Sequence, residues 1–207
     1  MGLKEPFNAV SHMVGAGLAI AFLPIVLLRA EHGGAMAMVA AALYGATLVA
    51  VFAMSAVYHS VTHPRASPWL FRLDQCMIYL LIAGTYTPVA LLLVQGSLGW
   101  LLFAIEWGLA ATGISLLLTV HRTPQWIHQA AYIVLGWAAL LALPRLLGLH
   151  WLALALLLAG GVAYTGGSAL YNRDRKTTWG IGDHGVWHLL VILGAAAHAV
   201  FIMAFIV

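Results

Sequence analysis

Seven apolar segments, each long enough to cross a lipid bilayer, account for most of this chain of 207 residues. A membrane-spanning helix needs about 20 mostly apolar residues. The segments run from Ala9 to Leu28, Ala35 to His59, Asp74 to Val94, Leu98 to Val120, Ile127 to Leu147, Trp151 to Tyr171 and His184 to Val207. We therefore predict an all-α integral membrane bundle of seven transmembrane helices that forms a single domain over residues 1–207.

The composition supports this prediction. Charged residues make up 7% of the chain and hydrophobic residues 63%, whereas soluble domains carry roughly 25% charged residues. The net charge of +3 is small and its basic residues are dispersed, so the sequence predicts no nucleic-acid-binding surface. The single cysteine, Cys76, excludes an intramolecular disulfide. The apolar run after Pro6 shows no clear cleavage site, and we expect a retained first helix and not a signal peptide.

The basic residues predict the orientation, because cytoplasmic loops carry the excess of Lys and Arg. With the N-terminus inside, only Arg29 and Arg145 lie on the outer side. The cytoplasmic side collects Lys4, Arg65, Arg72, Arg122, Arg173, Arg175 and Lys176. We therefore predict a cytoplasmic N-terminus and, after seven crossings, an extracytoplasmic C-terminus.

This orientation brings polar residues from several helices to one depth, near the cytoplasmic face. His59 ends the second segment, Asp74 begins the third, and His184 and His188 begin the seventh. Histidines four residues apart share one helix face, and Ser55 lies one turn deeper than His59 on the same face. Polar groups at membrane depth are costly and usually point inward in pairs or toward water. We therefore predict a functional site at this end of the bundle.

The residue types favour zinc. Zn²⁺ binds imidazole and carboxylate ligands, and a catalytic zinc usually has three protein ligands and an open position for water. We predict that His59, His184 and His188 are the metal ligands. Asp74 is the candidate for holding or deprotonating the water, with Asp183 as a weaker one, because a carboxylate just before a helix is more often an N-cap.

Simpler interpretations of the same residues stay open. Two histidines at a helix start are also typical of rings at the membrane interface. Ser55 is a candidate for polarising a substrate carbonyl or binding the zinc water, but a serine on a membrane helix more commonly bonds to its own backbone or to a neighbouring helix. A carboxylate at the start of the third helix, such as Asp74, also interacts favourably with the helix N-terminus.

Four motifs together resemble a known family. They are Asn8-Ala-Val-Ser-His12, Ser55-Ala-Val-Tyr-His59, Arg72-Leu-Asp74 continuing into Tyr79-Leu-Leu-Ile-Ala-Gly-Thr-Tyr-Thr-Pro88, and His184-x-x-x-His188 with His198 beyond. In this order they resemble the bacterial hemolysin III family, which is related to the progestin and adipoQ receptors and more distantly to alkaline ceramidases. The resemblance covers essentially the whole chain. It implies a multi-pass protein of the bacterial inner membrane with seven transmembrane helices and a cytoplasmic N-terminus.

The resemblance also implies a site. In this family pattern the residues matching His59, His184 and His188 bind zinc, and the residue matching Asp74 acts through water. The sequence departs from the pattern in two places: Gln75 stands where we expect His or Ser, and Glu106 interrupts the fourth segment. Neither touches the expected ligands.

Two further polar positions lead to separate expectations. His198 is ten residues past His188, about 15 Å along a helix axis, so we expect an interhelical hydrogen bond there and not a metal ligand. The Thr85 to Pro88 run is expected to distort the third helix, with the threonine hydroxyls bonding to backbone carbonyls.

Two classes of function fit these residues. The first is an integral-membrane zinc hydrolase acting on a lipid amide or ester, with zinc lowering the pKa of its bound water toward 7. The second is a non-enzymatic membrane protein, either a sensor of lipid or membrane state or a lytic protein, with a structural zinc that has four protein ligands. In both, a membrane lipid is the expected substrate or ligand. A retinal-type receptor is disfavoured, because Lys4 and Lys176 are the only lysines and neither lies in a predicted span.

Overall fold

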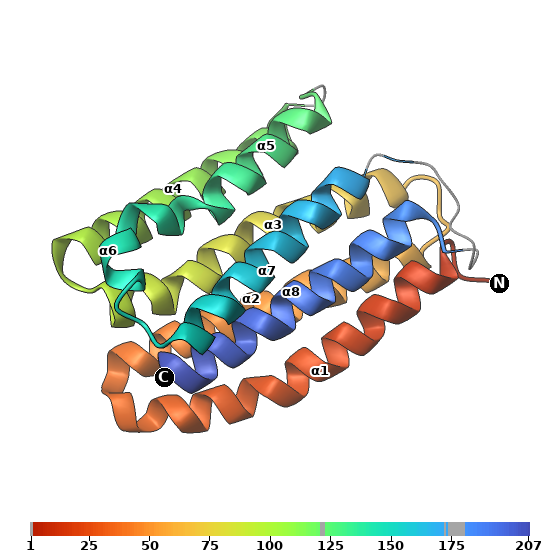
Figure 1. Ribbon diagram of the computed structural model, residues 1–207. Coiled ribbons are helices and arrows are strands. Elements are labelled where there is room, and N and C mark those ends of the chain that lie inside the picture. Colours follow the sequence, from red (N-terminus) through yellow and green to blue (C-terminus); the bar gives the residue numbers. More distant parts are fainter. Residues whose placement is uncertain (1, 121–122, 172, 174–180) are drawn as a thin grey trace.

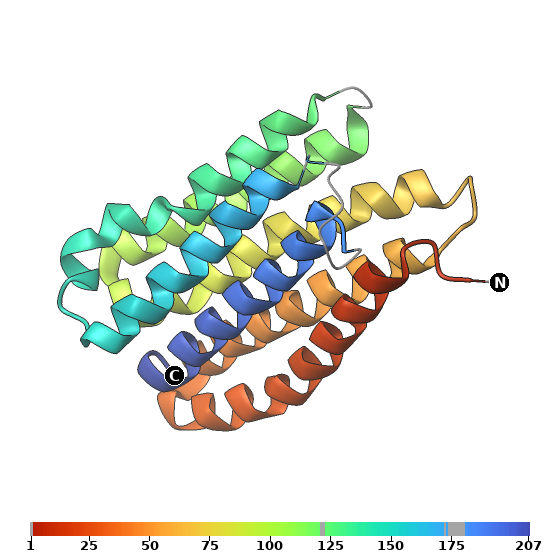
Figure 2. The same cartoon turned by 45° about the vertical axis from the view of Figure 1, so that its right-hand side comes forward.

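Long helices packed along one another form the computed structural model, which describes residues 2–120, 123–171, 173 and 181–207 (Figure 1; Figure 2). No residue within these ranges belongs to a β-strand. The predicted all-α class is therefore confirmed for the described part of the chain.

The helices follow one another with short connections. In chain order they are α1 (Pro6–Ala30), the 3₁₀ helix η1 (Glu31–Gly33), α2 (Gly34–Ser60), α3 (Ser67–Pro88), the π-helix η2 (Val89–Val94), α4 (Gly96–Thr119), α5 (Gln125–Gly136), the 3₁₀ helix η3 (Ala138–Ala142), α6 (Leu143–Leu146), α7 (Trp151–Leu170) and α8 (Asp183–Phe205).

Six described helical stretches are long and apolar enough to cross a membrane, one fewer than the sequence predicts. They are Pro6–Ser60, Ser67–Val94, Gly96–Thr119, Gln125–Leu146, Trp151–Leu170 and Asp183–Phe205. The difference arises in the first stretch, whose 55 residues contain α1, η1 and α2 without a break in helical structure. In both views α1 and α2 lie side by side, joined at one end by η1.

The two termini lie at opposite ends of the bundle (Figure 1; Figure 2). The N-terminus shares its end with the connection from α2 to α3, whereas the C-terminus lies at the end that carries η1. Three of the basic residues used to predict the orientation, Arg122, Arg175 and Lys176, lie outside the described residues.

Two helices begin three or more residues earlier than predicted, each near a proline. Helix α1 begins at Pro6 and not at Ala9, and α3 begins at Ser67, directly before Pro68. The fixed φ of proline suits the first turn of a helix, where its missing N–H is not needed. Asp74 therefore lies about two turns inside α3. Its interpretation as a charge at the helix N-terminus is wrong, because that interaction falls off within the first turn.

The fifth predicted segment is interrupted, contrary to the expectation of one helix. Helix α5 ends at Gly136 and is followed by η3 and the short α6. The hydroxyl of Tyr86, on α3, donates to the carbonyl of Gly136 at 2.8 Å and accepts the backbone N–H of Ala139 at 2.6 Å. A side chain from another helix thus satisfies backbone groups that the interruption leaves unpaired.

Small residues bring α2 and α3 close together. A Cβ atom added at Gly84 on α3 would lie 2.0 Å from Oγ1 of Thr47 on α2. Close backbone approach of this kind is typical of membrane helices that pack through small residues. Further along α3, the hydroxyls of Thr85 and Thr87 donate to the carbonyls of Leu81 and Ala83, at 2.7 and 2.8 Å. These bonds are as expected, and the distortion predicted here follows Pro88 as the π-helix η2.

Candidate metal site and adjoining cavity

Three histidines come together at the end of the bundle where the chain begins. His59 lies in the last turn of α2, and His184 and His188 lie in the first two turns of α8. One ring nitrogen of each lies within 4.8 Å of the corresponding nitrogens of the other two. In a tetrahedral zinc site with Zn–N bonds of about 2.0 Å, the nitrogens are about 3.3 Å apart. The three rings therefore need only small movements to share one ion.

The surroundings of the rings fit a metal chemically. His59 and His188 are each only 1% exposed, and the ring centroids of the three histidines lie 4.6 to 5.3 Å apart. Nδ1 of His188 is buried and has no hydrogen-bond partner among the residues the structure describes. An unpaired buried nitrogen is costly. Neutral imidazole nitrogens gathered in this way are the ligand set that zinc prefers.

Asp74 and Ser55 lie beside this group, on α3 and α2. Their side chains are buried, with 9% and 3% of the residue exposed. The Ser55 hydroxyl hydrogen-bonds to the Asp74 carboxylate, and His59 interacts with that carboxylate electrostatically. Asp183, the weaker candidate for a base, lies in the first turn of α8, where Gly182 and not Asp183 is the N-cap.

Glu5, which sequence reasoning did not select, contacts one of the three histidines directly. Its Oε2 lies 2.7 Å from Nδ1 of His59, and the side-chain amide of Asn8 donates to the same oxygen at 2.8 Å. The hydrogen bond with His59 is the main cause that lowers the pKa of Glu5 to about 2. With α1 starting at Pro6, the spacing of Glu5, Asn8 and His12 places them on one side of the first turns. That spacing is the signal that could have revealed Glu5.

His12 covers the site from α1. Its ring packs against that of His188, with centroids 3.8 Å apart, and meets the edge of Phe52 at 5.1 Å. The residue is 4% exposed. The group of three that could hold a metal does not include it. His12 therefore contributes to the wall around His188.

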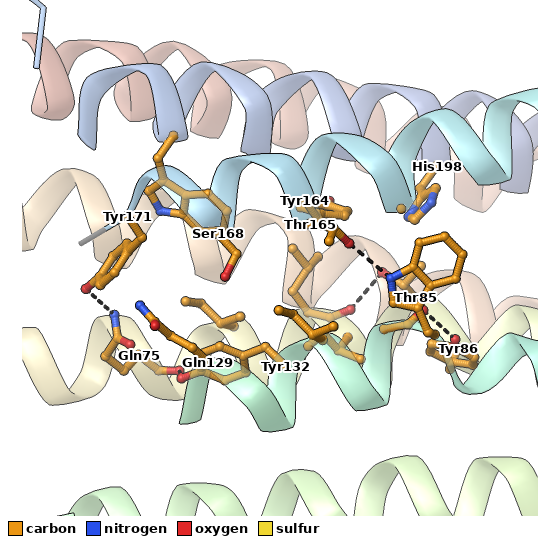
Figure 3. A pocket seen from close by; sticks show the side chains of 18 residues that line it. Gln75, Thr85, Tyr86, Gln129, Tyr132, Tyr164, Thr165, Ser168, Tyr171 and His198 are labelled. Carbon is orange, nitrogen blue, oxygen red and sulfur yellow. Dashed lines mark hydrogen bonds between the residues drawn. The ribbon is translucent and has the colours of Figure 1, made fainter. Parts of the chain in front are cut away.

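A cavity adjoins the histidines, between α3, α5, α7 and α8 (Figure 3). The empty space between its lining side chains, including the part that is open to the surroundings, is about 830 Å³. Gln75 and Tyr171 lie at one end, and Tyr86 and His198 lie toward the other. Its remaining wall is mainly apolar, with side chains such as Ile78, Leu81, Ile82, Ile133 and Trp137.

Two residues connect the cavity to the histidine group. Tyr171 lines the cavity, and its ring centroid lies 5.0 Å from that of His184. Trp187, between the two histidines of α8, also lines it. None of the three histidines is among the described residues of the cavity wall. Tyr171 and Trp187 therefore separate the proposed ligands from the cavity.

Two further intramembrane polar residues, His198 and Glu106, are not part of the histidine group. Nε2 of His198 hydrogen-bonds to the carbonyl of Leu157 on α7 at 3.1 Å, which confirms the predicted interhelical bond. Glu106 is completely buried in α4, and its two carboxyl oxygens have no hydrogen-bond partner among the described residues.

Comparison with known proteins agrees with the family resemblance of the sequence. The profile of the family described as "Haemolysin-III related" matches residues 2–199. The Hemolysin-3 protein of Bacillus cereus is 37% identical over 195 residues, which cover 93% of this chain and 87% of that protein. The Hemolysin-3 homolog of Bacillus subtilis (strain 168) is 32% identical over 196 residues, which cover 94% and 90%.

A human relative is more distant. The monocyte to macrophage differentiation factor of Homo sapiens is 29% identical over 164 residues, which cover 75% of this chain and 66% of that protein. The family match over nearly the whole chain, together with the long apolar helices, identifies a multi-pass protein of the cell membrane. This chain belongs to the haemolysin III-related family.

Proposed function

We propose that this protein is an integral-membrane zinc hydrolase that cleaves an amide or ester bond of a lipid. The observation that carries the proposal is the group formed by His59, His184 and His188, in which His184 is partly exposed and the other two are buried, beside a carboxylate. Three imidazoles leave one tetrahedral position open, which distinguishes a catalytic zinc from a structural one.

Each residue of the site has a role in this reaction. His59, His184 and His188 would hold the metal, which when bound would lower the pKa of a water and polarise the scissile carbonyl. Asp74 would orient the attacking water and accept its proton. Ser55 holds the Asp74 carboxylate through the hydrogen bond between their side chains.

The cavity supports a lipid as the substrate. Its wall is mainly apolar and lies between membrane helices, which suits an acyl chain. At one end of the cavity, the ring of Tyr171 lies beside the ring of His184. Gln75 and Tyr171 are joined there by a hydrogen bond of 3.2 Å, so polar groups are available near the histidines for an amide or ester. A mainly apolar wall with a few polar side chains is typical of sites that bind ligands of low polarity.

A non-enzymatic membrane protein, with a lytic or sensing role, is the second candidate. The name Hemolysin-3, given to two of its relatives, favours the lytic role. In that case zinc is structural and Asp74 is the fourth ligand.

Hydrolysis of defined lipids by the purified protein tests the proposal. We expect zinc-loaded protein to release fatty acid from an amide-linked or ester-linked lipid, activity to disappear after zinc is removed with a chelator, and activity to return when zinc is added back. Zinc-loaded protein that releases no fatty acid from either lipid class would favour the second candidate.

We further propose that the chain crosses the membrane seven times, with the N-terminus in the cytoplasm. The helices α1 and α2 have 25 and 27 residues, so each is long enough to cross alone. Their side-by-side arrangement and the opposite positions of the two termini support an odd number of crossings.

Reporter fusions test this topology. A reporter attached after Val207 is expected to read as extracytoplasmic, and one inserted in the connector between α7 and α8 as cytoplasmic, because basic residues are retained inside. The reverse pattern would move the histidine site to the outer face, and equal signals for the two fusions would show that α8 does not cross the membrane, which would contradict the topology of seven crossings.

A further inference from the structure

The residues just before α1 are attached to the last turn of α2. The backbone N–H of Glu5 donates to the carbonyl of His59 at 2.9 Å, while the Glu5 side chain contacts the ring of the same histidine. The side-chain amide of Asn8 donates to the same carboxylate oxygen. Both the main chain and the side chain of Glu5 are thus positioned against His59.

This contact determines which ring nitrogen of His59 is available to bind a metal. An ionised carboxylate is only an acceptor, so the hydrogen in the 2.7 Å contact belongs to Nδ1 of His59. A metal ligand needs an unprotonated nitrogen, and Nε2 is the one that remains. The second ring nitrogen of a metal-binding histidine is commonly bonded to a carboxylate in this way, which fixes the tautomer and the ring orientation.

A simple surface ion pair does not account for the geometry. Nζ of Lys4 lies 3.6 Å from Oε1 of Glu5, but the side chain of His59 is only 2% exposed and its nitrogen is closer, at 2.7 Å from Oε2. Lys4 also lies over the ring of Tyr58, 3.8 Å from its centroid. The lysine therefore has another partner, whereas Glu5 is the hydrogen-bond partner of Nδ1 of His59.

We propose that Glu5 is a positioning residue for the metal site: it holds the hydrogen of His59 on Nδ1 and directs Nε2 toward the metal. This inference rests on the metal site of the proposed function. It adds the segment before the first membrane helix to the site.

Zinc affinity of the purified full-length protein, measured by competition with a chelator, is the first test. Glu5→Ala is expected to weaken zinc binding about 10- to 100-fold, the usual effect of losing a partner behind a metal ligand. Glu5→Gln retains an acceptor oxygen without the charge and should fall between Glu5→Ala and the wild type. The control Glu31→Ala removes an exposed carboxylate in η1, at the other end of the bundle, and should leave affinity unchanged. Lys4→Ala should change it by no more than about fivefold, as expected for an ion pair that is partly exposed to solvent.

A measurement on zinc-free protein separates positioning from general stability. With ¹⁵N-labelled histidine, and His59 assigned from a His59→Gln spectrum, the wild-type ring should carry its hydrogen on Nδ1, whereas Glu5→Ala should lose this preference. Glu5→Ala protein that binds zinc as tightly as wild type, or that keeps the His59 tautomer, would overturn the inference. Because this spectrum needs no metal, it also tests the role of Glu5 if the wild type binds no zinc and the proposed function fails.

Discussion

Asp74→Asn is expected to lower the rate of lipid hydrolysis about 10²- to 10⁴-fold, the usual effect of losing a general base, while zinc stays bound. Asparagine has nearly the same shape as aspartate but cannot accept the proton of the metal-bound water. The three histidines are unchanged, so the protein should still carry about one zinc per chain when zinc is supplied in excess, even if the loss of a nearby carboxylate weakens affinity about 10- to 100-fold. Metal analysis and the hydrolysis assay on the same preparation check both expectations.

Asp183→Asn is the matched control, because it makes the same change in the carboxylate next to His184. We expect it to retain activity, which would assign the base to Asp74. Loss of both zinc and thermal stability in Asp74→Asn would show that Asp74 is a direct ligand of a structural metal. An Asp74→Asn variant that behaves as wild type in every assay would remove this carboxylate from the mechanism.

The His184→Ala, His188→Ala double variant is expected to lose its zinc and with it all hydrolysis. Wild-type protein should contain about one zinc per chain, whereas the double variant retains only His59 of the three ligands and should contain less than about a tenth of that amount. Elemental analysis of purified protein measures the difference directly.

A double variant at exposed histidines controls for the number of substitutions. His32 and His63 lie outside the buried group and are exposed, so replacing both with alanine should leave the zinc content unchanged. Undiminished zinc in the His184→Ala, His188→Ala protein would disprove the assignment of these two residues as ligands.

The sequence allows the helical class and the three-histidine group to be predicted for simple physical reasons. Segments of about 20 apolar residues have few folded alternatives, and the four-residue spacing of His184 and His188 places both on one helix face. His59 can be predicted to lie beside them once the end of α2 and the start of α8 are assigned to the same end of the bundle.

Other features depend on information that hydropathy does not carry. Glu5 precedes the first apolar run, so hydropathy does not mark it, and its contact with His59 depends on the packing of α1 against α2. The early start of α3 at Ser67 lies in a polar and aromatic stretch that apolar windows exclude. The interruption after Gly136 depends on a bond from Tyr86, 50 positions away in sequence. The cavity arises from how four helices fit together, and no local pattern encodes it.

The division of residues between the histidine group and the cavity has an evolutionary consequence. The proposed ligands and the base lie on α2, α3 and α8, whereas α5 and α7 contribute only to the cavity wall. Substitutions at positions such as Ile133 or Thr165 can therefore reshape the space for a ligand without altering any metal-binding ring. Related proteins with this arrangement can therefore evolve to bind different ligands while the metal-binding residues stay the same.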